Sequence, residues 1–88
     1  MGNCELCDMI TNNQKIYLDT AEILIAEVND NLVVGCLKEH KTDMSEKGKS
    51  GLIKAMTKNI SRNKPGKVYS FKKADGVVGH FGVYATIK

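Results

Sequence analysis

The segment His80-Phe81-Gly82-Val83-Tyr84-Ala85-Thr86-Ile87 alternates regularly between two sets of side chains. One set is apolar throughout and consists of Phe81, Val83, Ala85 and Ile87. The other set consists of His80, Gly82, Tyr84 and Thr86. Because successive side chains of a β-strand point to opposite faces of its sheet, this pattern predicts a strand with its apolar face on the main core. His80 should therefore point away from that core.

The preceding segments predict further strands. Leu32–Leu37 is an almost continuous apolar run of strand length, which is typical of a strand covered on both faces. It follows Ile23–Val28, which is rich in β-forming residues, across the turn-forming residues Asn29–Asn31. This arrangement favours a hairpin. Shorter β-forming runs at Ile16–Leu18 and Lys67–Phe71 complete a set of about five strands.

One long helix is predicted between the third and fourth strands. Apolar residues recur there at helical spacing, namely Leu52, Ile53, Met56 and Ile60. Ser45 is a suitable N-cap for this stretch, and Lys64-Pro65-Gly66 should end it. Gly48 and Gly51 weaken its first turns by up to about 1 kcal/mol each relative to alanine. The order of the elements predicts an α+β domain in which one main helix packs on a face of an antiparallel sheet.

Length and composition narrow the class of protein further. A chain of 88 residues predicts a single domain, residues 1–88, with a small core. Hydrophobic residues make up 42% and charged residues 26%, which excludes a fibrous or disordered chain. No apolar run approaches the roughly 20 residues of a membrane span, and the first residues lack the basic and apolar regions of a signal peptide. These features predict a cytoplasmic protein without a membrane association.

Cysteine and histidine provide the main chemical lead. Cys4 and Cys7 form a C-x2-C pair, a spacing at which both sulfurs can reach one Zn²⁺ ion. The sequence has two histidines, His40 and His80, and each lies at the end of a predicted strand. The four residues would make a Cys2His2 site, although the spacing alone leaves a chance pair of cysteines equally open. Cys36, the third cysteine, lies within an apolar strand and is better explained as a small buried residue.

Four segments, in order along nearly the whole chain, resemble motifs of the histidine-triad (HIT) proteins and the related galactose-1-phosphate uridylyltransferases. Cys4-Glu5-Leu6-Cys7-Asp8-Met9-Ile10 resembles their C-x-x-C-x-I-I opening. Leu32–His40 resembles their apolar strand that ends in a lysine and a histidine, and Asp43–Glu46 resembles the segment that enters their helix. Gly79–Ala85 falls where their H-φ-H-φ-H-φ-φ motif is found. The resemblance implies a HIT-like fold.

The same resemblance implies a metal site and the loss of a catalytic group. In zinc-bearing members the ion is held by residues that correspond to Cys4, Cys7, His40 and His80. The middle histidine of the family's triad attacks the α-phosphate of a nucleotide, and this position is Gly82 here. Glycine supplies no nucleophile, so the family mechanism is expected to be absent. The third triad position is Tyr84, which could donate a hydrogen bond to a ligand.

Three functions follow from these observations. The favoured hypothesis is a zinc-stabilised, non-catalytic domain that binds a partner protein or a nucleotide-like ligand. The second is a divergent nucleotide hydrolase or transferase that uses Tyr84 or another residue. The third is a basic zinc protein that binds nucleic acid, because basic residues follow one helical face and the next strand: Lys47, Lys54, Lys58, Arg62, Lys72 and Lys73. A net charge of +3 does not by itself establish such a partner. HIT proteins commonly pair, so a homodimer is expected by analogy only.

Overall fold

The computed structural model describes residues 5–39, 41, 44–73 and 80–88. Within them the chain forms a five-stranded antiparallel sheet and a long helix packed on it, which confirms the predicted α+β class. In chain order the elements are α1 (Glu5–Thr11), β1 (Lys15–Asp19), β2 (Ile23–Asn29), β3 (Leu32–Leu37), α2 (Glu46–Asn63), β4 (Tyr69–Lys73) and β5 (Gly82–Ile87).

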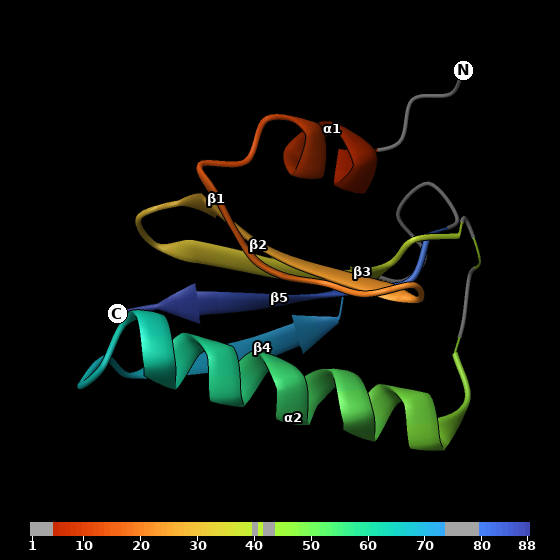
Figure 1. The fold of residues 1–88 in the computed structure, drawn as a ribbon. Coiled ribbons are helices and arrows are strands. Elements are labelled where there is room, and N and C mark those ends of the chain that lie inside the picture. Colours follow the sequence, from red (N-terminus) through yellow and green to blue (C-terminus); the bar gives the residue numbers. More distant parts are fainter. Residues whose placement is uncertain (1–4, 40, 42–43, 74–79) are drawn as a thin grey trace.

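The strands lie in the order β1-β2-β3-β5-β4, so β3 occupies the centre of the sheet (Figure 1). β2 and β3 form the predicted hairpin, and the Asn31 amide donates a hydrogen bond to Asn29 Oδ1 in its turn at 2.8 Å. Strand β5 pairs with β3 on one side and with β4 on the other. β1 and β4 are therefore the two edge strands.

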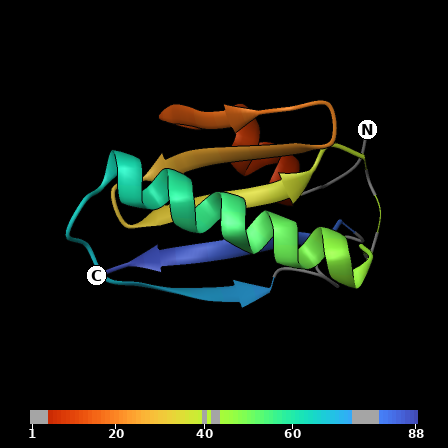
Figure 2. The same ribbon diagram turned by 60° about the horizontal axis from the view of Figure 1, so that its bottom comes forward.

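One face of the sheet carries the main core beneath α2 (Figure 2). Its buried residues are Ile25, Val33, Leu52, Met56, Ile60, Phe81, Val83, Ala85 and Ile87. Gly35 lies at the centre of this face, where an added Cβ would stand 2.7 Å from Met56 Sδ. Only glycine permits this close approach of α2 to β3, because a methyl group would overlap the sulfur.

Helix α2 has the predicted boundaries. Ser45 is its N-cap, and the Ser45 hydroxyl accepts a hydrogen bond from the Gly48 amide at 3.1 Å. The helix continues to Asn63, and Gly66 then takes a positive φ of 83°, which lets the chain turn back toward β4. The glycines at positions 48 and 51 thus do not delay the start of the helix.

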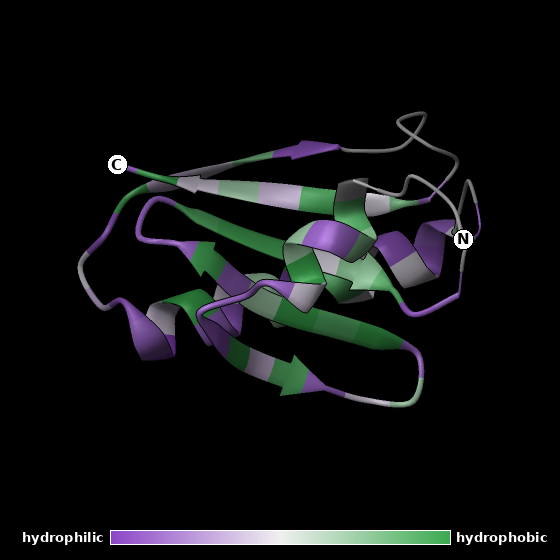
Figure 3. Cartoon of the chain, turned by 90° about the horizontal axis from the view of Figure 1, so that it is seen from above, coloured by the Kyte–Doolittle hydropathy of each residue, from purple (hydrophilic) through white to green (hydrophobic). Residues whose placement is uncertain are grey.

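The opposite face of the sheet is covered by α1 (Figure 1). The sequence predicts only a turn or a helical turn here, whereas α1 is a seven-residue helix whose Leu6 is fully buried. Leu6 packs with Val34 and Cys36 of β3 in a second buried cluster. In the view from the α1 side, hydrophobic residues gather in the strands beneath the helix, and hydrophilic residues occupy the turns and the end of β4 (Figure 3).

The second buried layer explains the position of His80. The histidine does lie outside the main core, but it is only 2% exposed because it is buried on the α1 side. Strands β4 and β5 also begin two residues later than predicted, at Tyr69 and Gly82. At β5 the reason is a change of hydrogen-bond partner, since the Phe81 amide donates to the Lys41 carbonyl at 2.6 Å.

A polar cluster joins the C-terminal end of α2 to the first hairpin. Tyr17 donates its hydroxyl proton to Glu27 Oε1 at 2.5 Å, and Lys64 Nζ lies 3.6 Å from the same oxygen. Burial raises the pKa of the Tyr17 hydroxyl well above the usual range for tyrosine. The hydrogen bond to Glu27 and the negative charge of Glu27 raise this pKa further. All three causes disfavour a phenolate at this position.

We expect Tyr17 to stay protonated at alkaline pH well above the ordinary pKa of a tyrosine hydroxyl. A pKa that is raised on folding stabilises the native state fully below about pH 10, the ordinary value for tyrosine, and this contribution is lost as the pH rises through the higher folded value. Phenolate absorbance measured against pH should show one group that titrates late. That group should vanish in Tyr17→Phe; an unchanged titration in this variant would contradict the assignment.

Candidate metal centre

Two of the four predicted zinc ligands come together in the described structure. Cys7 lies on α1 and His80 precedes β5, and their Sγ and Nδ1 atoms are 3.9 Å apart although 73 positions separate them in the sequence. The packing of α1 on the sheet produces this contact, because the buried Leu6 side chain of α1 packs against β3. Cys4 and His40, the other two predicted ligands, lie outside the described residues.

The orientation of His80 fits a metal ligand. Its Nε2 lies 2.6 Å from the Leu37 carbonyl oxygen, which can only accept a hydrogen bond. In the neutral imidazole the proton therefore resides on Nε2, and the Nδ1 lone pair faces Cys7 Sγ. In histidines that bind metals, the N–H group of the second ring nitrogen typically donates a hydrogen bond, often to a backbone carbonyl as here. This hydrogen bond fixes both the tautomer and the orientation of the ring.

The distance between the two side chains also fits a zinc ion. Zn–S and Zn–N bonds at a tetrahedral ion place the sulfur and nitrogen about 3.6 Å apart, and the observed separation is 3.9 Å. A cavity of about 170 Å³ adjoins the pair, and its lining includes Cys7, Cys36, Leu37 and His80. Small adjustments of the side chains would suffice for both to bind one ion.

Among residues 5–39, 41, 44–73 and 80–88, no group of three or more histidine, cysteine, aspartate or glutamate side chains is placed to hold a metal ion. The four-residue site therefore stays a prediction. The hydrogen bond from Phe81 to Lys41 joins the residues that directly follow His80 and His40 in the sequence.

Gly82, which the resemblance to HIT proteins aligns with the middle triad histidine, has little space beside it. A Cβ built there would stand 2.8 Å from Leu6 Cδ1 and 3.3 Å from Cys36 Cβ. It would also lie 3.2 Å from the Gly35 carbonyl oxygen, which belongs to the backbone of the central strand. Hence the position lacks a nucleophile and also lacks the room for one. The sequence shows the first fact, whereas the role of Leu6 emerges only in the folded chain.

Tyr84 lies on the same face of the sheet, opposite Val34 of β3. It is partly buried and packs against the cluster of Leu6, Val34 and Cys36. Its ring thus helps to cover this face, and the contact of its hydroxyl with a ligand stays a prediction.

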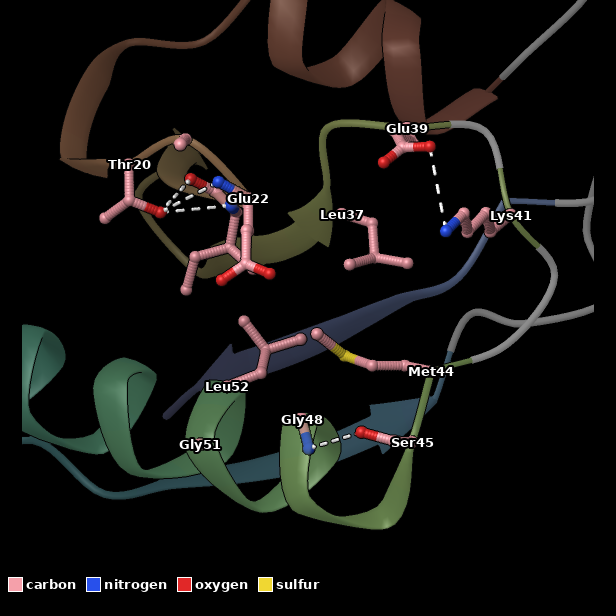
Figure 4. Close-up of a pocket in the computed structure, with 12 residues that line it drawn as sticks. Thr20, Glu22, Leu37, Glu39, Lys41, Met44, Ser45, Gly48, Gly51 and Leu52 are labelled. Carbon is pink, nitrogen blue, oxygen red and sulfur yellow. Dashed lines mark hydrogen bonds and ion pairs between the residues drawn. The ribbon is translucent and has the colours of Figure 1, made fainter.

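A larger cavity lies on the other face of the sheet, beside the first turns of α2 (Figure 4). It has a volume of about 560 Å³ and is lined by apolar, glycine and charged residues: Thr20, Ala21, Glu22, Ile23, Leu37, Glu39, Lys41, Met44, Ser45, Gly48, Gly51 and Leu52. Glu39 and Lys41 form an ion pair at its rim, at 3.7 Å. Sequence patterns do not reveal this cavity, because three separate segments enclose it.

Comparisons with known proteins identify no relative of this chain. No protein-family model, curated protein or solved structure matches it. Neither described helix combines the length and the hydropathy that a membrane crossing requires.

Proposed function

We propose that this chain is a zinc-stabilised domain of HIT-like fold that binds a partner protein or a nucleotide-like ligand and does not catalyse its conversion. The juxtaposition of Cys7 and His80 beside the closed position at Gly82 carries the proposal. A surviving pair of metal ligands next to a filled catalytic position favours a structural role for the metal and a binding role for the domain.

In this proposal Cys4, Cys7, His40 and His80 hold the ion. Two thiolates and two imidazoles make a closed structural centre, which leaves no position on the metal for a substrate. The ion would supply folding free energy by tying α1 to the ends of two strands, which a core of this size otherwise holds weakly. His80 is well suited to this role because the Leu37 carbonyl already fixes its ring.

The sizes of the two cavities support ligand binding at a place other than the triad position. The cavity beside Cys7 and His80 has only about 170 Å³, whereas sites for small molecules typically have about 300 to 1,000 Å³. The cavity beside α2 has about 560 Å³. A nucleotide-like ligand would therefore bind beside Gly48 and Gly51, on the face of the sheet that carries α2.

The proposal is tested by a panel of nucleoside phosphoramidates, dinucleoside polyphosphates and sugar nucleotides. We expect no turnover of any of them. A true ligand should raise the melting temperature of the protein without being consumed. Metal-dependent hydrolysis that disappears in Tyr84→Phe would overturn the proposal in favour of a divergent hydrolase.

A variant at the edge of the larger cavity tests the place of binding. Gly51 lines the cavity and has no atom within 4 Å of the position of a Cβ, so Gly51→Leu should fold normally and reduce the ligand's thermal shift. Ser50→Leu is the matched control, because Ser50 is exposed on the same helix and does not line the cavity. Equal shifts in both variants would place the ligand elsewhere.

A further inference from the structure

The net charge of this protein is small, but its acidic and basic residues are strongly segregated along the chain. Residues 1–43 contain three basic and eight acidic residues, a net of −5. Residues 44–88 contain ten basic and two acidic residues, a net of +8. The two halves sum to the overall +3, so the small total gives no measure of the local field. The second half includes α2 and β4.

Helix α2 presents four of these positive charges on one exposed face, formed by Lys47, Lys54, Lys58 and Arg62, which we call the basic face. Spacings of seven, four and four residues place them on the same side of the helix, along about 22 Å. The opposite side of α2 is buried on the sheet through Leu52, Met56 and Ile60. The outer side of the helix faces away from the sheet (Figure 2).

Among the described residues, the basic face carries no compensating negative charge. The single acidic residue of α2 is Glu46, in its first turn, where it lies 3.6 Å from Lys49 Nζ. Within the described ranges, no carboxylate forms an ion pair with any of the four side chains of the basic face. Four like charges on one helix repel each other, so this face is suited to an anionic partner.

Strand β4 adds further positive charge beside the helix. Lys72 and Lys73 of β4 line one hollow of about 120 Å³ together with Lys49 of α2, and none of the described residues that line it is acidic. Figure 2 shows β4 running along the sheet edge next to α2. The positive surface thus extends from the helix to the edge strand, and a long polyanion could contact both.

We propose that the basic face binds the phosphate backbone of duplex nucleic acid. The inference goes beyond the function proposed above, because duplex nucleic acid is a different class of partner from a protein or a nucleotide-like ligand. Ser50 and Ser61 lie exposed among the cations and offer hydroxyl groups to phosphate oxygens. Aromatic residues are absent from α2, so base stacking on the helix is not available, and binding should be independent of sequence.

An anionic membrane is the less suitable partner. Helices that lie on membranes insert large apolar side chains beside their basic residues. In the described part of the chain the exposed large hydrophobic residues are Ile16 and Val68, and both lie outside α2. The outer surface of α2 is polar, which suits phosphates in water better than an acyl layer.

Fluorescence anisotropy with a labelled, mixed-sequence duplex tests the proposal. Four phosphate contacts predict a slope of about −3.6 for log K against log salt, so affinity should fall about 150-fold between about 50 and 200 mM salt. In Lys54→Gln/Lys58→Gln the slope should drop to about −1.8, because two contacts are lost. Both substitutions lie on the exposed side of the helix and should leave the fold unchanged.

The matched control is Lys38→Gln/Lys88→Gln, which removes the same charge away from α2 and should keep the steep slope. Absence of binding at low salt, or equal loss in both double variants, would overturn the proposal. Binding only to vesicles of phosphatidylcholine and phosphatidylserine, or self-association through the acidic half in sedimentation, would overturn it as well. Zinc content measured on the same samples separates this outcome from a failure of the proposed metal site.

Discussion

Removal of the proposed zinc ion is expected to unfold most of the protein molecules. Structural zinc sites have apparent binding free energies of about 10 to 16 kcal/mol, which matches or exceeds the whole stability of a small domain, about 5 to 15 kcal/mol. Cys7→Ser should therefore lose its metal and unfold at far lower denaturant than the unaltered protein. A strong chelator should have the same effect on the unaltered protein, and elemental analysis should find one zinc ion per chain before treatment.

Cys36→Ala is the control for this experiment. Cys36 is buried in the cluster formed by Leu6 and Val34, and it lines the same cavity as Cys7 and His80, but it is not a predicted ligand. Its truncation should cost only about 1 kcal/mol, as for the loss of one buried group, and should leave the zinc content intact. The metal site would be refuted by a melting temperature that does not respond to the chelator.

The second large effect concerns Gly82, which the proposed HIT-like fold places at the middle position of the triad. Gly82→Ala places a methyl group 2.8 Å from Leu6 Cδ1 and close to the backbone of Gly35, so we expect a loss of about 1 to 3 kcal/mol in the free energy of unfolding. Leu6→Ala empties a fully buried site and should cost about 2 to 5 kcal/mol. Denaturant titrations of both variants give these values.

The two substitutions should be strongly non-additive. In the double variant the methyl group at position 82 enters the space that Leu6 leaves, so the combined loss should be smaller than the sum by at least about 0.5 kcal/mol. Gly82→His should fold poorly and gain no nucleotidyl transfer, because the imidazole has no room beneath α1. Strict additivity would show that Leu6 does not fill the position. Zinc analysis of each variant shows whether α1 stays docked.

Much of the fold follows from local patterns. The alternation of Phe81, Val83 and Ala85 with polar or small residues predicts β5, and the apolar run of β3 predicts a strand covered on both faces. Ser45 predicts the start of α2, since its hydroxyl is the hydrogen-bond acceptor that the first helical turn needs. In each case the residues that make the pattern lie within a few positions of one another.

The candidate site can be predicted only in part from local sequence patterns. The C-x2-C spacing identifies Cys7, and the resemblance to HIT motifs identifies His80, but neither predicts that the Leu37 carbonyl orients the imidazole. The resemblance also points to Gly82 as a missing nucleophile, but it does not show that Leu6 occupies the space. Leu6 is one apolar residue in a seven-residue helix, a signal too short to predict a second buried layer.

Local patterns in the amino-acid sequence were enough to predict the strands, the long helix and its caps, the hairpin, the absence of a nucleophile at Gly82 and the basic side chains of α2. The covering of the second face of the sheet by α1, the contact between Cys7 and His80, and the cavity between α2 and the end of β3 became known from the folded chain. The two groups of features differ in the range of the interactions that produce them. Hydrogen-bonded turns and alternating side chains depend on neighbours in the chain, whereas contacts across some seventy residues depend on how whole elements pack.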